Sequence, residues 1–580
     1  MNVNPVVSEI VSGALRSLEE EVEDLLARIW RSPGLRDSRE FSVTLSDRFG
    51  RALTGRSLGA SPVPVMAAFP PEEMRPGDVF LHNDPYLSPL GFGDTAELCL
   101  TRPLFDAERL LAFLQVRARH DDLGGMRPGG AAGGASEVYH EGLLVPPVRI
   151  ARGERLAGDV WTLLVRNSRL PETLGDDVEA QLAALRVGAA RLGELTGRCG
   201  AENLTACFAD LLRECEVAFE DLISRLPAEG SWEVETAVET DGFGGPHPLR
   251  LALRREGRRA VVDLDGAGPQ ARGPINCPLE GEGRTFLTRM IAPLMLHLAE
   301  EPDRFAAGAL NDGAGRAIEV RLPGPGTLLT PRFPAPTGFC ALTMGRLVSA
   351  FGEALFEASG GRTPAGFDNL RAWSLWGKDQ EGGYLLFRES LGAGTGAGPE
   401  ADGVSAVPPF GGTGGMSIEA VETRYPLRIE SMGLATDSGG AGRRRGGLGI
   451  YREYRLLLEG EAASAADGGG GGEGPFGGSG GGPGAPYRIR LLREGKAPED
   501  LPPIGAATAF SAEDILRVET PGGGGWGPPA ERPPEEVLRD VLRGFVSPGS
   551  AREVFLVALR GEPAWEVDEK ETRRLRGGGG

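Results

Sequence analysis

The residues best suited to acid–base or metal chemistry gather in the N-terminal third of the chain. Only five of the 580 residues are histidines, and three of them lie between positions 82 and 140. Carboxylates accompany them in the same stretch. The imidazoles and carboxylates of this region are Glu40, His82, Asp84, Asp94, His120, Asp121, Asp122, His140 and Glu141. A divalent metal needs such side chains to converge from neighbouring loops. The loops His82–Asp94 and His120–Gly125 are therefore predicted to hold a metal or acid–base site.

Other interpretations of the polar loops stay open. Asn83-Asp84-Pro85 is also a typical turn opener, so these side chains could simply cap a loop. A serine hydrolase would need a Gly-x-Ser-x-Gly elbow between a strand and a helix. The bare pattern occurs at Gly55–Gly59 and within the glycine run at Gly477–Gly481, and neither match is flanked by a strand pattern and a helix pattern. The glycine-rich stretch Gly392–Gly415 shows neither of the two nucleotide-binding glycine patterns, and glycine clusters alone are a weak indication of a phosphate site.

The bulk composition limits the partners. A formal net charge of -20 argues against a nucleic-acid-binding surface, because neutralising phosphates requires clustered lysine and arginine. No window holds the roughly 20 apolar residues of a membrane span, and the first nine residues show no signal-peptide pattern. The six cysteines are scattered without a CxxC pair, which fits a reducing compartment. We therefore expect a cytoplasmic protein that binds neither nucleic acid nor membrane.

Hydrophobic periodicity indicates the elements that must position the loops. Residues Val6–Arg31 read as an amphipathic helix that packs on a domain or a partner, and Leu174–Leu226 as a helix hairpin broken near Gly200. Strand patterns flank the two loops and return after the hairpin. The clearest predicted strands are Phe41–Leu45, Val79–Leu81, Leu110–Val116, Val261–Asp263, Ala317–Leu322, Tyr487–Leu492 and Ile515–Glu519. The expected fold class is α+β, with mixed sheets, packed helices and many glycine-rich loops.

At this length two or three domains are expected. We predict an N-terminal domain with the chemical loops and the helix hairpin (1–230) and a central mixed domain (231–460). A glycine-rich flexible insertion (461–486) follows, because the run Gly468–Gly484 cannot bury a core. A β-rich C-terminal segment with a small helical tail (487–580) completes the chain.

Several motifs, taken in order, resemble the hydantoinase B/oxoprolinase family. The resemblance covers nearly the whole chain and includes its glycine-rich turns. The motifs that carry it are Asn83-Asp84-Pro85-Tyr86 followed by Asp94, Arg117-Ala-Arg-His120-Asp-Asp-Leu-Gly-Gly125, Tyr139-His-Glu-Gly142, Gly273-Pro-Ile-Asn-Cys-Pro278, Arg424-Tyr-Pro426, Ser438-Gly-Gly-Ala-Gly442 and Thr520-Pro-Gly-Gly-Gly-Gly525.

The resemblance implies a multi-domain subunit that works with others. In the family, an A-type subunit or domain of actin-like ATPase fold binds ATP and phosphorylates a carbonyl or enol oxygen of the substrate. The B-type subunit then holds a chamber with a divalent metal (zinc, manganese or iron) in which the activated species reacts. The reaction is hydrolysis of a cyclic amide, such as a hydantoin or 5-oxoproline, or carboxylation of a ketone, as in the acetone and acetophenone carboxylases. The implied partners are the A-type ATPase in a hetero-oligomer and a small carbonyl or lactam substrate.

The sequence departs from the family at positions that the resemblance assigns to the metal. Gly91 stands where a histidine is expected, and Arg119-His120 stands for a His-His pair. Glu40 replaces an aspartate, and a histidine-rich segment is absent near Val407–Thr413.

The remaining ligand set is expected to comprise Glu40, Asp94, His120 and His82. Without a metal, His120 would act as acid or base and Arg119 as an electrostatic clamp on an oxyanion. The catalytic residues are thus predicted to be His120, Arg119 and Asp94. The alternative is a catalytically degenerate structural subunit, because a retained fold does not guarantee a retained site.

Overall fold

The computed structural model describes residues 5–55, 59–87, 94–130, 132–299, 310–368, 371–378, 381–408, 414–465, 474–502, 504 and 507–577. Its described helices include none with the length and apolarity of a membrane span. Helices and several sheets occur in separate layers, and one strand pair is parallel while the others are antiparallel. The predicted α+β class with mixed sheets is confirmed.

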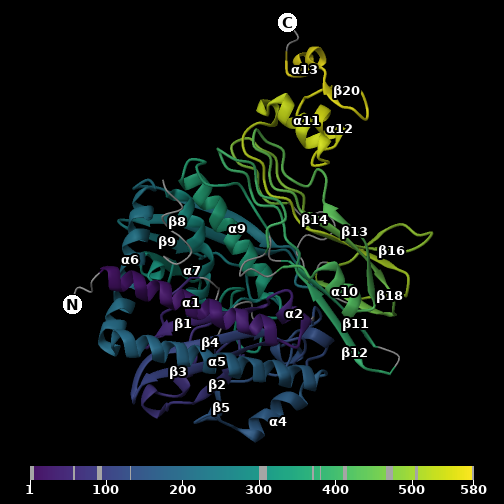
Figure 1. Cartoon of the computed structure of the whole chain (residues 1–580). Coiled ribbons are helices and arrows are strands. Elements are labelled where there is room, and N and C mark those ends of the chain that lie inside the picture. Colours follow the sequence, from purple (N-terminus) through teal and green to yellow (C-terminus); the bar gives the residue numbers. More distant parts are fainter. Residues whose placement is uncertain are drawn as a thin grey trace.

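The N-terminal unit is built on a six-stranded antiparallel sheet in the order β1-β4-β3-β2-β5-β6. Helices α1 (Pro5–Ile29) and α5 (Pro171–Cys199) pack against each other, and α5 contacts β3 and β4 (Figure 1). A third long helix, α6 (Ala201–Ser224), forms a hairpin with α5, and the other helices of the unit are short. The strands are β1 (Phe41–Asp47), β2 (Val79–His82), β3 (Glu97–Asp106), β4 (Arg109–Arg119), β5 (Val148–Arg152) and β6 (Arg155–Leu156), and the short helices are α2 (Pro33–Arg36), α3 (Val63–Ala68) and α4 (Gly158–Arg166).

The two faces of this sheet differ in chemistry. On the helix-covered face, Leu98, Leu100 and Val116 join one buried cluster with the apolar stripe of α1. On the other face, the alternating residues are polar: Gln115 donates to Thr101, and Arg117 pairs with Glu97. Successive strand residues point to opposite faces, so this alternation decides where each candidate side chain lies.

The helix hairpin is confirmed. Helix α5 ends at Cys199 and α6 (Ala201–Ser224) begins at Ala201, with Gly200 between them at φ 77°. The sequence predicts that the apolar stripe of α1 packs on a domain or a partner. In the structure most of this stripe is buried within the chain, where Val11, Leu15 and Val22 are fully covered. Most of that face is therefore not available to another subunit, although Ile10 and Ile29 near its two ends are exposed.

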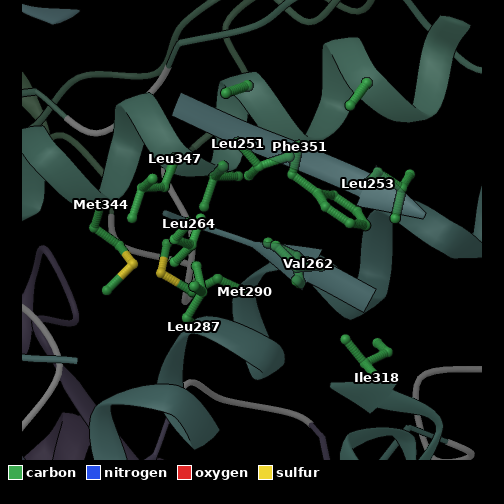
Figure 2. Packing of buried hydrophobic residues seen from close by; sticks show 14 of the residues in the cluster. Leu251, Leu253, Val262, Leu264, Leu287, Met290, Ile318, Met344, Leu347 and Phe351 are labelled. Carbon is green, nitrogen blue, oxygen red and sulfur yellow. The ribbon is translucent and has the colours of Figure 1, made fainter. Parts of the chain in front are cut away.

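A second core lies in the central unit, between the sheet β10-β9-β8-β7 and helices α7 and α9. Figure 2 shows Leu251, Leu253 and Val262 of the sheet facing Phe351 and Leu347 of α9. Strand β10 runs parallel to β9, which makes this the mixed sheet. The elements are β7 (Ser231–Val238), β8 (His247–Glu256), β9 (Arg259–Asp263), α7 (Glu282–Met295), α8 (Ala314–Ala317), β10 (Ile318–Arg321) and α9 (Cys340–Ala358).

Two further sheets follow, with a third hydrophobic cluster between their strands. Their orders are β12-β11-β15-β18 and β13-β14-β19-β16-β17. The elements are β11 (Ala372–Lys378), β12 (Tyr384–Glu389), α10 (Ile418–Arg424), β13 (Leu427–Leu434), β14 (Ile450–Leu456), β15 (Gly460–Ala465), β16 (Arg488–Leu492), β17 (Glu499–Asp500), β18 (Thr508–Phe510) and β19 (Ile515–Glu519).

Glycine-rich segments pack side by side between these sheets and the C-terminal tail (Figure 1). The segment Thr520–Trp526 exchanges backbone hydrogen bonds with residues near 366, 396, 440 and 480. The backbones approach so closely that a Cβ on Gly523 would lie 1.8 Å from the carbonyl oxygen of Thr395. Only glycine fits such contacts.

This packing corrects part of the expected flexible insertion 461–486. Residues 466–473 lie outside the described part. Gly474–Gly484 packs with Thr520–Trp526 and with the segments near residues 366, 396 and 440, and we call this set of segments the glycine bundle. Gly478 donates to Gly525, and Gly482 donates to Ala441. Glycine here allows close packing and does not loosen the chain.

The C-terminal tail is a small unit with its own core of Val537, Ala551, Phe555 and Val557. Buried Arg532 joins it to the glycine bundle through Asp402. Its elements are α11 (Pro534–Leu542), α12 (Pro548–Glu553), β20 (Leu559–Arg560), β21 (Glu566–Val567) and α13 (Glu569–Leu575). The proposed domain boundaries themselves stay a prediction.

Candidate active site

An ion pair between Asp94 and Arg119 forms the centre of the candidate site. Arg119 ends β4, and its Nε lies 2.6 Å from Oδ2 of Asp94. Its Nη2 donates to the carbonyl of Gly129 at 2.8 Å, and Oδ1 of Asp94 accepts from the amide of Ala96 at 2.9 Å. The two side chains are 9% and 10% exposed, so the pair is almost enclosed.

A second guanidinium reaches the same carboxylate from a distant part of the chain. Arg388 Nη1 lies 3.3 Å from Oδ2 of Asp94, across 294 sequence positions. Its Nε lies 3.8 Å from Oε1 of Glu40, whose side chain is 10% exposed. The carbonyl of Glu40 also accepts from the amide of Arg119 at 3.0 Å, which places Glu40 beside β4. Two carboxylates thus face two guanidinium groups.

The neighbour of Arg388 holds its strand in place. Glu389 is fully buried at the end of β12 and accepts from the amide of Met416 and from Nη1 of Arg452, both at 2.8 Å. The hydroxyl of Tyr454 donates to its other oxygen. This fully partnered group ties β12 to β14 and thereby positions Arg388 over Asp94.

Electrostatics distinguish the two arginines. Burial acts to lower the pKa of Arg119, but Asp94 and then Glu40 outweigh it, so the pKa of Arg119 is raised. Burial and the neighbouring charge of Arg119 lower the pKa of Arg388, and Glu40 and Asp94 offset this only in part. The positive charge of Arg388 is therefore the less compensated of the two.

His120 lies on the other side of the sheet. It follows Arg119, so its ring points toward α5, where Nε2 is 3.2 Å from Oε1 of Gln181 and the ring meets Trp30 edge-on at 6.5 Å. It is 1% exposed, and burial lowers its pKa despite the charge of Asp177. The sequence-based expectation put His120 and Asp94 in one site, and the structure separates them by the thickness of the sheet.

His82 shares the polar face with Arg119, but it lies in another cross-strand row. It pairs with Cys99, which pairs with Arg117, whereas Arg119 pairs with Glu97. His82 is fully buried and neither ring nitrogen makes a hydrogen bond with a described residue. Burial lowers its pKa to about 4.

The donor set of the described residues does not fit a divalent metal. Of the four expected ligands, only Glu40 and Asp94 meet, and guanidinium groups already face both of them. Metal-bound imidazoles ordinarily have their second nitrogen held by a hydrogen bond, and His82 has no such bond to any residue that the structure describes. Within the described ranges no three His, Cys, Asp or Glu side chains are arranged to hold one ion. Gly91 and most of the segment Val407–Thr413 lie outside those ranges.

Glu141 closes the site toward the central unit. It is 2% exposed and accepts from the amides of Gly338 at 2.7 Å and Thr337 at 3.1 Å, just before α9. Burial raises its pKa to about 8, with a further contribution from Asp94 and an opposing one from the two amides. Tyr86 donates to the carbonyl of Ala335 at 2.7 Å in the same seam. These contacts join the N-terminal and central units beside Asp94.

Other polar residues of the two loops are structural. Asp122 is 1% exposed and accepts from the amides of Gly124, Gly129 and Arg169, which shapes the loop after His120. Asn83 accepts from the amide of Val145, and Asp84 accepts from that of Tyr86. The loop-capping interpretation therefore holds for Asn83 and Asp84.

The described residues offer little support for the competing chemistries. The Sγ atoms of Cys340 and Cys277 lie 2.8 Å apart, and this contact, then burial, raises the pKa of Cys340 well above its usual range. Such a thiol is a poor nucleophile. In the glycine stretch, the amides of Gly394, Thr395 and Ala397 all donate to backbone carbonyls, so they do not cradle a phosphate.

The arrangement can therefore stabilise an oxyanion electrostatically, through guanidinium donors in a largely enclosed setting. The structure brings together Asp94, Arg119 and Glu40 from the predicted set, and sets His120 and His82 apart. Sequence reasoning missed Arg388, since no motif marks it. Alternation along β4 was the one available signal against His120, because consecutive strand residues face opposite ways.

Comparisons with known proteins find matches that cover nearly the whole chain. The family model described as Hydantoinase B/oxoprolinase matches residues 4–529. The beta subunit of caprolactamase from Pseudomonas jessenii is 30% identical over 99% of this chain and 99% of its own. The crystal structure of the ATP-dependent caprolactamase of that organism superposes with a TM-score of 0.85 at 28% identity, covering 99% and 100% of the two chains. A nucleotide-free acetone carboxylase matches with a TM-score of 0.81 at 19% identity, covering 99% of this chain and 82% of that one, which shows a shared fold.

Proposed function

The chain belongs to the hydantoinase B/oxoprolinase family, and from that premise we propose that it is the B-type subunit of an ATP-dependent, cytoplasmic hetero-oligomer that opens a cyclic amide. An A-type partner would bind ATP and phosphorylate the amide carbonyl. This chain would then hold the activated species while the ring is hydrolysed. Similarity to a caprolactamase subunit over the full length of both chains supports the lactam over a ketone.

The observation that carries the proposal is the cluster of Asp94, Arg119 and Arg388 at the seam of three structural units. Side chains from β4, β12 and the segment that precedes β3 meet there. A phosphorylated carbonyl carries negative charge on oxygen, and fixed guanidinium groups stabilise such charge without reorganising. Glu141 would act as a positioning residue, because it fixes the wall formed by Thr337 and Gly338.

The test is reconstitution with the A-type neighbour. The two chains are co-expressed and purified, and ATP hydrolysis is measured with caprolactam, hydantoins, 5-oxoproline and small ketones. We expect ATP turnover that depends on a lactam or hydantoin and yields the ring-opened amino acid. Carboxylated product from a ketone would instead assign the chain to the carboxylase branch. A complex that shows no substrate-dependent turnover in any assay would favour a structural subunit.

A further inference from the structure

We propose that Arg119 and Arg388 supply the positive charge of this site in place of a divalent cation, and that Arg388 is the residue that contacts an oxyanion of the substrate. This inference rests on the proposed function for the identity of the substrate. Its claims about metal and anion binding concern the isolated chain.

The charges of the cluster are already balanced. Asp94 and Glu40 are the two carboxylates available to a metal ion, and both are about one-tenth exposed. Arg119 contacts the first of them, and Arg388 lies between the two. A dication placed among these groups would face two fixed guanidinium charges at short range, in surroundings where charge repulsion is poorly screened.

The geometry also removes the imidazoles from reach. His120 is buried under α5, and His82 lies in the next cross-strand row with unpartnered ring nitrogens among the described residues. At the position where an imidazole would point toward Asp94 from the end of β4, the chain carries Arg119. The guanidinium group of Arg119 thus takes the place of both the metal ion and its imidazole ligand.

The two arginines have different tasks. Arg119 is committed, because Nε binds Asp94 and Nη2 binds Gly129. Among the described residues, Arg388 makes one long hydrogen bond, from Nη1 to an oxygen that Arg119 already occupies, and its buried Nε makes none. Its side chain is 32% exposed, against 9% for Arg119. Arg388 therefore retains donors on its Nη atoms and partial access to solvent.

The chemistry of the guanidinium group indicates the class of ligand. Its planar fork matches the oxygens of a carboxylate or phosphate in a bidentate arrangement. We assign Arg388 to the phosphoryl or carboxylate oxygens of the activated carbonyl substrate. Asp94 and Glu40 would hold Arg388 in place and leave its outer edge toward the ligand.

The experiment uses the full-length chain without its partner. Metal content is measured by elemental analysis after dialysis, and calorimetric titrations are run with Zn²⁺, Mn²⁺ and inorganic phosphate. The variants are Arg388→Gln and Arg388→Lys, the latter keeping the charge without the fork. Arg428→Gln is the matched control, since Arg428 is an exposed strand arginine paired with Glu430. Thermal unfolding confirms that each variant folds.

We expect well under one metal equivalent per chain and no tight Zn²⁺ or Mn²⁺ binding. Phosphate affinity should fall at least tenfold in Arg388→Gln and severalfold in Arg388→Lys, and stay unchanged in Arg428→Gln. One tightly bound equivalent of metal that Asp94→Asn releases would overturn the inference. So would a wild-type chain that binds no phosphate, or equal phosphate affinity in Arg388→Gln. Because these readouts need no partner, they fail or succeed independently of substrate-dependent turnover in the reconstituted complex.

Discussion

Arg119 and His120 are neighbours in the chain and lie on opposite faces of one sheet. Arg119 forms a 2.6 Å contact with Asp94 on the polar face, and His120 lies 3.2 Å from Gln181 on the helix-covered face. The first residue is therefore in the seam where structural units meet, and the second is part of a core. This separation gives the two residues different predicted phenotypes.

The Asp94–Arg119 pair should contribute to stability. Replacing Arg119 by Gln leaves the nearly buried Asp94 with the amide of Ala96 and one longer ion pair, to Arg388. We therefore expect a loss of about 3 kcal/mol, as found for the breaking of buried ion pairs. Thermal unfolding of the purified chain should show a midpoint several degrees lower. Arg191→Gln is the control, because Arg191 pairs with Glu21 at 46% and 42% exposure and exposed pairs contribute little. Equal midpoints for both variants would contradict this expectation.

A side chain at Gly338 should destabilise the protein. A Cβ there would lie 3.1 Å from Oε1 of Glu141, the oxygen that accepts the amide of Gly338. We expect Gly338→Ala to displace the carboxylate, leave a buried group poorly bonded and cost roughly 1–3 kcal/mol. Gly134→Ala serves as a loop control, since its Cβ would meet nothing within 4 Å. Urea unfolding compares the two, and a neutral Gly338→Ala would show that the contact is unimportant.

The stability should decline with rising pH through the titration of Asp121. Burial, then the charge of Asp177, raises the pKa of Asp121 to about 7 from its ordinary 3.8. A folded state that holds its proton more tightly is stabilised fully below the unfolded pKa, and that contribution is lost as the pH rises through about 7. The unfolding free energy, measured from pH 4 to 8, should therefore fall less steeply in Asp121→Asn than in the wild type.

The slope that one such proton contributes is at most about 1.4 kcal/mol per pH unit. Glu21→Gln is the control, because Arg191 lowers the pKa of Glu21, so its contribution has the opposite sign. Identical slopes for Asp121→Asn and the wild type would refute the assignment.

The glycine bundle should depend on particular glycines. A Cβ on Gly523 would lie 1.8 Å from the carbonyl oxygen of Thr395, whereas a Cβ on Gly398 would meet nothing within 4 Å. We expect Gly523→Ala to reduce the yield of folded protein severely and Gly398→Ala to leave it unchanged. Soluble expression and thermal unfolding distinguish the two. A well-folded Gly523→Ala with wild-type stability would mean that the bundle is not tightly packed.

Local patterns predict the elements well and long-range packing poorly. The helix α1 and the hairpin broken at Gly200 follow directly from apolar periodicity and a helix-ending glycine. The glycine run before β16 offered no period to read, because its role depends on contacts with segments from 366 to 525. Composition alone favours a flexible linker for this glycine run. In the structure its described part, Gly474–Gly484, is instead packed closely against other backbone segments.

The candidate site likewise shows that local patterns are predictable from the sequence and long-range contacts are not. Of the residues that the sequence predicts for the site, Asp94, Arg119 and Glu40 lie together, and the site itself stays a prediction. Arg388 comes from a strand 294 positions away from Asp94, which only the tertiary fold brings near. Histidine clustering and the family resemblance place His120 in one site with Arg119, although strand alternation puts adjacent residues on opposite faces.

The most direct test of the central claim compares Arg119 and His120 in turnover. The chain is reconstituted with its A-type partner, and substrate-dependent ATP hydrolysis and ring opening are measured at equal concentrations of folded protein. If the chemistry takes place on the face of Asp94, Arg119→Gln should lose about 100-fold or more in kcat. Arg119 supplies one of the two guanidinium charges of the site and binds Asp94, so its loss removes electrostatic stabilisation from the site. His120→Gln should stay within about tenfold of the wild type and mainly lower the unfolding midpoint. Near-normal turnover in Arg119→Gln with abolished turnover in His120→Gln would contradict the account.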